Sequence, residues 1–170
     1  MHPRTSPPGK LIFILLVAAL WTIPGGGQPW PYAPPPPFAP PTNPSAQRGA
    51  AGGVRAQVGW VQNACQTAPS YGDGGYGNVW QQFQNLRGAY VGFKNTLTPQ
   101  QLSAGANEIA ELDAGLDILQ ESFNNYQEDV AAGQSTNSAL NSLCQVLSQA
   151  SGVWLQEFNR DCGRIGVSQF

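Results

Sequence analysis

The chain has 170 residues, of which 41% are hydrophobic and only 11% are charged, and its formal net charge at pH 7 is −2. It lacks the basic excess that binding to nucleic acid requires, so we expect no nucleic-acid partner. Its single histidine is His2, at the very start of the chain.

The first segment has the order of a secretory signal peptide. Arg4 and Lys10 precede an apolar run from Leu11 to Leu20, as the basic and apolar regions of such a signal do. The run falls short of the roughly 20 residues that span a bilayer, so we expect no stable membrane span. Gly25 and Gly27 favour cleavage after Gly27. The sequence therefore predicts a signal peptide at residues 1–27 and a secreted, extracellular protein; an uncleaved signal anchor is the alternative.

Cleavage would change the chemistry that the chain can perform. Without His2 it cannot build the usual catalytic triads or the commonest zinc site. Loss of Arg4 and Lys10 leaves six of the eight basic residues against all ten acidic ones, which moves the net charge from −2 to −4. The glycine-rich residues 72–77 lack the lysine of a phosphate-binding loop. We therefore expect no enzyme, no cofactor and no metal.

Proline dominates the next segment, which reads PWPYAPPPPFAPPTNP. Proline fixes φ and removes backbone donors, so this stretch should adopt polyproline II. Its aromatic residues Trp30, Tyr32 and Phe38 are candidate contacts to an extracellular partner, although a semi-rigid linker is an equally simple interpretation. Residues 45–53 (SAQRGAAGG) look like a flexible hinge. Residues 28–53 are therefore expected to form a disordered arm.

From Val54 onward apolar residues recur with the spacing of helices. Each such set of apolar residues forms a stripe along one face of a helix. The first stripe ends at Pro69 and a glycine-rich loop, and the apolar residues of the second recur at alternating intervals of four and three residues. The first consists of Val54, Val58, Val61, Cys65 and Ala68, and the second of Val79, Phe83, Leu86, Tyr90, Phe93 and Leu97.

Two more helices follow. Thr98, Pro99 and Gln101 form a capping-box sequence that opens the third helix, which Gly133 closes. The fourth begins near Ser135 or Thr136 and ends at Gly163. The third stripe is Ile109, Leu112, Leu116, Leu119, Phe123, Tyr126 and Val130, and the fourth is Leu140, Leu143, Cys144, Leu147, Trp154 and Phe158.

Amphipathic helices joined by short turns pack antiparallel. We therefore predict an all-α fold, a small antiparallel bundle of about four helices at residues 54–165, preceded by the disordered proline-rich arm and followed by a tail at 166–170. Glycines inside the helices cost about 1 kcal/mol each relative to alanine. Some could allow close helix approach, and Gly152 could break the fourth helix. The glycines are Gly59, Gly88, Gly92, Gly105, Gly115 and Gly152.

The three cysteines all lie in the segment expected outside the cell, where disulfides form. On one continuous helix Cys144 and Cys162 would be about 27 Å apart and could not pair. Cys65 and Cys144 would lie at the same end of an up-down-up-down bundle, so they are the predicted disulfide. Cys162 is then a candidate for an intermolecular bond and a homodimer; it could also be buried, or fold back onto Cys144 through a break at Gly152.

Other side chains have simpler structural interpretations. Trp60, Trp80 and Trp154 are expected as core or edge aromatics, and Glu108 and Glu111 as favourable charges at a helix start. An acidic ridge of Asp113, Asp117, Glu121 and Glu128 should lie opposite the third apolar stripe. It is either a solvated face or a candidate dock for a basic partner.

The sequence thus favours a secreted, non-enzymatic interaction or structural module that binds an extracellular protein, polymer or surface. The alternative is a carrier that holds a small apolar ligand inside the bundle, and a weaker third possibility is an effector acting on a host protein. A carrier would need a cavity lined by Phe83, Tyr90, Phe123 and Trp154, whereas a binding module would have a filled core.

Overall fold

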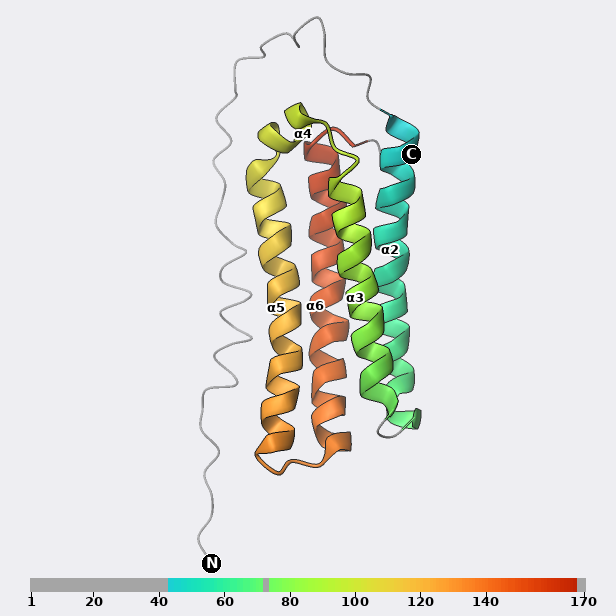
Figure 1. Cartoon of the computed structure of the whole chain (residues 1–170), viewed down its shortest axis with the longest axis vertical. Coiled ribbons are helices and arrows are strands. Elements are labelled where there is room, and N and C mark those ends of the chain that lie inside the picture. Colours follow the sequence, from blue (N-terminus) through green and yellow to red (C-terminus); the bar gives the residue numbers. More distant parts are fainter. Residues whose placement is uncertain (1–42, 72–73, 168–170) are drawn as a thin grey trace, which may run out of the picture. The chain divides into compact units, whose positions relative to one another are not determined.

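The computed structural model describes residues 43–71 and 74–167, and these contain helices and no strands (Figure 1). The predicted all-α class is therefore confirmed. The expected signal peptide at residues 1–27 lies outside the described residues, as do Trp30, Tyr32 and Phe38. The helices are α2 (Pro44–Thr67), the 3-10 helix η1 (Ala68–Tyr71), α3 (Gly74–Lys94), α4 (Pro99–Ala104), α5 (Ala106–Ala131) and α6 (Thr136–Arg164).

The four long helices form the predicted antiparallel bundle (Figure 1). Helix α2 packs against both α3 and α6, and α5 packs against α6. The short α4 lies at the end of the bundle where α3 ends and α5 begins. Helices α3 and α5 are joined by side chains rather than by close backbone contacts. This seam between α3 and α5 contains the candidate site.

Each long helix contributes one apolar stripe to a common core. The expected stripes supply most of it, while Ile109, Tyr126 and Val130 are only half-buried at its edge. The largest fully buried side chains are Trp154, Tyr90, Phe83, Phe93, Phe123, Phe158, Leu86, Leu112, Leu119, Leu147, Val54 and Val58.

The helix ends follow the predicted capping chemistry. The Thr98 hydroxyl accepts a hydrogen bond from the Gln101 amide at 3.2 Å, and the Gln101 side chain accepts one from the Thr98 amide at 3.0 Å. Ser135 caps α6 by accepting from the Ser138 amide. Gly133, with a φ of 89°, ends the turn after α5. The predicted capping box, the start of α6 and the closing glycine are therefore confirmed.

The first helix begins at Pro44 instead of Val54, so the prediction of a hinge at residues 45–53 is wrong. Asn43 caps the helix by accepting from the Ala46 amide at 3.0 Å, and Pro44 occupies a first-turn position that suits proline. Gln47 is buried and donates to the Thr96 carbonyl at 3.0 Å and to the Gln101 side chain at 2.7 Å. The helix is therefore held by polar contacts to the α3–α4 connection, which the apolar pattern does not reveal.

The third predicted helix is divided at Gly105 into α4 and α5. A Cβ at Gly105 would lie 1.8 Å from Cγ2 of Ile165, so the backbone passes this side chain only as glycine. Helix α6, by contrast, runs through Gly152 without a break. Beyond it, Val167 is buried and its amide donates to the Cys162 carbonyl at 2.8 Å, so the packed unit extends into the predicted 166–170 tail.

Candidate functional site

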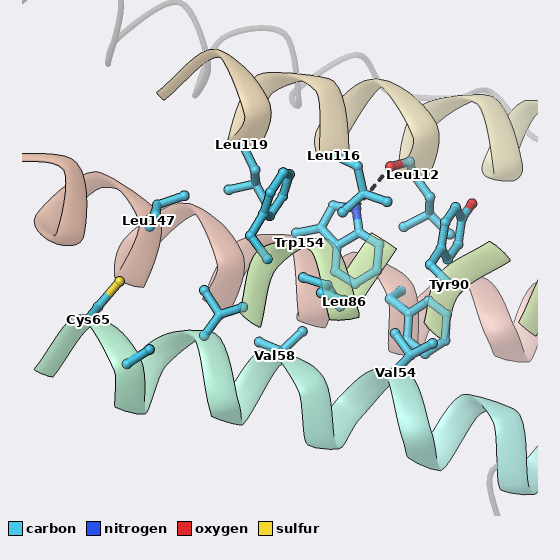
Figure 2. Close-up of a cluster of buried hydrophobic side chains, with 14 of the residues drawn as sticks. Val54, Val58, Cys65, Leu86, Tyr90, Leu112, Leu116, Leu119, Leu147 and Trp154 are labelled. Carbon is cyan, nitrogen blue, oxygen red and sulfur yellow. Dashed lines mark hydrogen bonds between the residues drawn. The ribbon is translucent and has the colours of Figure 1, made fainter. Parts of the chain in front are cut away.

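Cys65 and Cys144 are buried side by side where α2 ends and α6 begins. All three cysteines are present as thiols, and the sulfur of Cys65 points toward α6 (Figure 2). The hydrogen bond between the two thiols, with burial, raises the pKa of Cys65, and the same bond lowers the pKa of Cys144. The two thiols are therefore placed beside each other, as disulfide formation requires. The disulfide itself stays a prediction.

Cys162 lies in the core near the other end of α6. It has no exposed surface, and burial raises the pKa of its thiol to about 11. A bond from Cys162 to a second chain would therefore require this end of the bundle to open. The position of Cys162 agrees with the alternative that this cysteine is buried. It leaves the Cys162 thiol off the surface, where a disulfide-linked homodimer would need it.

The acidic residues of α5 do not form one uniform ridge. Asp117, Glu121 and Glu128 are exposed, but Asp113 lies on the flank that faces α3. Its Oδ1 is 2.7 Å from Nζ of Lys94. The expectation that Asp113 lies opposite the apolar stripe is therefore wrong, because its side chain reaches the neighbouring helix and is neutralised there.

A groove of about 340 Å³ runs between α3 and α5. Its floor includes Tyr90 and Leu116, which are buried, and Val91 projects into it with 51% of its surface exposed. The remaining lining residues are Arg87, Lys94, Asp113 and Asp117. The groove therefore combines an apolar floor with charged walls, as ligand sites commonly do.

Two side-chain bridges cross the seam at the ends of this groove. At one end Lys94 pairs with Asp113 and lies 4.9 Å above the centre of the Tyr90 ring. At the other end Nη1 of Arg87 donates to Oε1 of Gln120 at 3.1 Å. The bridges are two helical turns apart on each helix, about 10.5 Å along the axis. They join α3 to α5 across the seam.

The groove leaves one charge of each sign without an ion-pair partner among the described residues. The guanidinium of Arg87 binds a neutral amide, and Asp117 on the opposite wall makes no ion pair with any described cation. Sequence reasoning identified Asp117 but missed Arg87. The available signal was the two-turn spacing of Arg87 and Lys94, which places both cations on one flank of the second stripe.

A second charged cluster surrounds Asp161 near the end of α6. Asp161 is fully buried; its Oδ1 accepts from Nε of Arg160 at 3.0 Å and lies 3.5 Å from Arg164, while its Oδ2 has no hydrogen-bond partner. Arg160 also contacts Glu157 and lies 3.8 Å from Glu111. Of these contacts, the one with Glu111 reaches α5, and the others join residues within α6. Sequence reasoning missed this cluster, because a buried aspartate resembles a surface one in sequence.

The four aromatic residues proposed to line a carrier cavity pack together in two pairs. The ring centroids of Phe83 and Phe123 are 5.0 Å apart, and those of Tyr90 and Trp154 are 5.6 Å apart, edge to face. Nε1 of Trp154 donates to the Leu112 carbonyl at 2.9 Å (Figure 2). Both ring pairs are thus within the range of favourable aromatic contact.

The other tryptophans occupy different environments. Trp80 is half-buried with its ring edge to face against Phe123, as expected for an edge aromatic. Trp60 is 56% exposed on α2, so it does not belong to the core. Within the described ranges no three histidine, cysteine or acidic residues gather as a metal site would require, and none of the helices combines the length and apolar character of a membrane span.

Comparison of the chain with protein-family models, with curated proteins and with solved structures gives no match.

Proposed function

We propose that the protein is a secreted, non-enzymatic binding module whose helical bundle presents the groove between α3 and α5 to an extracellular partner. The basic residues, apolar run and small residues of the first 27 positions support secretion. Two side-chain bridges join the walls of the groove, Lys94 to Asp113 and Arg87 to Gln120.

The packing of the aromatic core is the observation that carries this proposal. Phe83, Tyr90, Phe123 and Trp154 would have to stand apart around a ligand in a carrier. Phe83 instead contacts Phe123, and Tyr90 contacts Trp154, while the hollow with polar walls lies at the surface. A filled core favours a module that binds on its outside over a carrier that binds within.

The chemistry of the nucleophilic side chains also supports a non-enzymatic role. The mature chain would contain no histidine to serve as a general base. All three cysteine thiols are buried, Cys65 and Cys144 beside each other and Cys162 in the core, so none of them is exposed to a substrate in the described structure.

Native mass spectrometry of the secreted protein tests the proposal. We expect a chain that begins at Gln28 and carries no apolar ligand. An N-terminus that still includes Leu11 to Leu20 would contradict secretion by cleavage. A stoichiometric apolar ligand without charged groups that survives purification would contradict the binding module and favour the carrier.

A further inference from the structure

We propose that the groove between α3 and α5 binds a small zwitterion with an apolar side chain, of the size of an apolar dipeptide. This inference rests on the proposed binding role and adds the chemical class of the ligand. It follows from the size of the groove, from its two uncompensated charges and from its apolar floor.

The dimensions of the groove suit a ligand of this size. Its volume of about 340 Å³ is near the lower limit of small-molecule pockets. The bridges at Lys94 and Arg87 bound it at a spacing of about 10.5 Å along α3. Two extended residues span about 7 Å, so a dipeptide fits between the bridges without displacing them.

The charges of the groove call for one anion and one cation in the ligand. Arg87 uses Nη1 to bind Gln120, which leaves its other N–H groups available to a carboxylate in a two-pronged contact. Lys94 already neutralises Asp113. Asp117 is therefore the acid left to bind an ammonium group. A ligand with a single charge would leave either Arg87 or Asp117 without a counter-charge.

The floor of the groove determines what lies between the two charged ends. Val91 is half-exposed and lines the groove together with Leu116 and Tyr90. Covering this apolar surface is favourable for an aliphatic side chain and unfavourable for a polar one. The ligand class is thus an apolar amine–carboxylate compound.

Three dipeptides separate the contributions of the charges. Leu-Leu carries both charges, N-acetyl-Leu-Leu only the anion, and Leu-Leu-amide only the cation. Each is titrated into the 15N-labelled mature protein, and amide shifts are followed by NMR. We expect Leu-Leu to shift the amides of Tyr90, Val91 and Leu116 saturably, and each singly charged peptide to bind about fivefold or more weakly.

Matched variants test the two walls. Arg87→Gln and Asp117→Asn should each weaken Leu-Leu binding by about fivefold. Glu121→Gln, one turn further along α5 and outside the groove, should leave it unchanged. An unchanged spread of amide shifts checks that each variant folds. If a variant does not fold, the titrations of the three peptides into the unaltered protein still test the proposed ligand class.

The proposal that the groove binds a zwitterion would be overturned if the groove amides showed no saturable shifts, or if all three peptides bound with equal affinity. An equal effect of Glu121→Gln would also overturn it. Such a failure is distinct from failure of the binding-module proposal, which native mass spectrometry would reveal as a retained apolar ligand without charged groups.

Discussion

Trp154 fits into the core because the residue that faces it on α5 is glycine. A Cβ at Gly115 would lie 2.6 Å from Cδ1 of Trp154, closer than real Cβ contacts. The indole is also fixed by its hydrogen bond to the Leu112 carbonyl, so it cannot move aside freely. One missing methyl group thus sets the separation of α5 and α6 at this level.

Gly115→Ala should destabilise the protein by about 1–3 kcal/mol, because the added methyl group overpacks the core. Gly88→Ala is the matched control, since Gly88 lies within α3 with nothing within 4 Å of its added Cβ. It should stabilise by about 0.5–1 kcal/mol through helix propensity. Chemical denaturation measures both. Stabilisation by both alanines would show that α5 and α6 are not in close contact at Trp154.

Cys162 gives the bundle a predictable dependence on alkaline pH. Its pKa is raised from 9.0 to about 11 by burial, so the folded state holds this proton more tightly than the unfolded state. The stabilisation is complete below pH 9 and is lost as the pH rises toward 11. Between pH 8 and 10.5 the protein should lose about 1–2 kcal/mol more than Cys162→Ala does.

Denaturation of both proteins in reductant measures this difference, because Cys65 and Cys144 then titrate alike in each. If the free energies of unfolding of the two proteins changed in parallel with pH, Cys162 would be accessible to solvent. An intermolecular disulfide through Cys162 would then be possible again.

At the scale of elements, the sequence predicted those helices whose stripes contain large apolar residues. Helices α3, α5 and α6 follow their stripes, and local side-chain chemistry identified the caps at Thr98 and Ser135. The first turns of α2 escaped prediction because their buried face contains Gln47 and Ala51 rather than large apolar residues. The break at Gly105 depends on contact with Ile165, which local sequence cannot reveal.

The groove could be predicted only in part. Asp113 and Asp117 stand out as acids one turn apart, and Arg87 and Lys94 as cations two turns apart. Which flank of α3 faces which flank of α5 depends on the hand in which the bundle is wound, and apolar periodicity does not determine it. The pairing of Lys94 with Asp113 therefore required the structure.

The thiol pair should link α2 to α6 in the oxidised protein. Cys65→Ser and Cys144→Ser should each destabilise the oxidised protein by about 2–4 kcal/mol and have a smaller effect in reductant, because the cross-link restricts the unfolded chain. A non-reducing peptide map should show Cys65 joined to Cys144 and Cys162 as a free thiol. A peptide that joins Cys144 to Cys162 would be incompatible with an unbroken α6.

Across the whole bundle, α5 differs in charge from α2 and α3. Every charged residue of α5 is acidic, whereas α2 and α3 carry Arg48, Arg55, Arg87 and Lys94 and no acid within their bounds. The seam between α3 and α5 is where the two signs meet. Opposite charges there favour the pairing of α3 with α5 and leave both signs available at the groove.

The central claim is that this scaffold has a filled core and binds at its surface. Xenon enters dry apolar cavities large enough to hold it, so NMR spectra of the mature protein under xenon pressure test the claim directly. We predict no saturable shifts at the amides of Phe83, Tyr90, Phe123 and Trp154. Saturable shifts at these four positions would place a cavity among the rings and contradict the account.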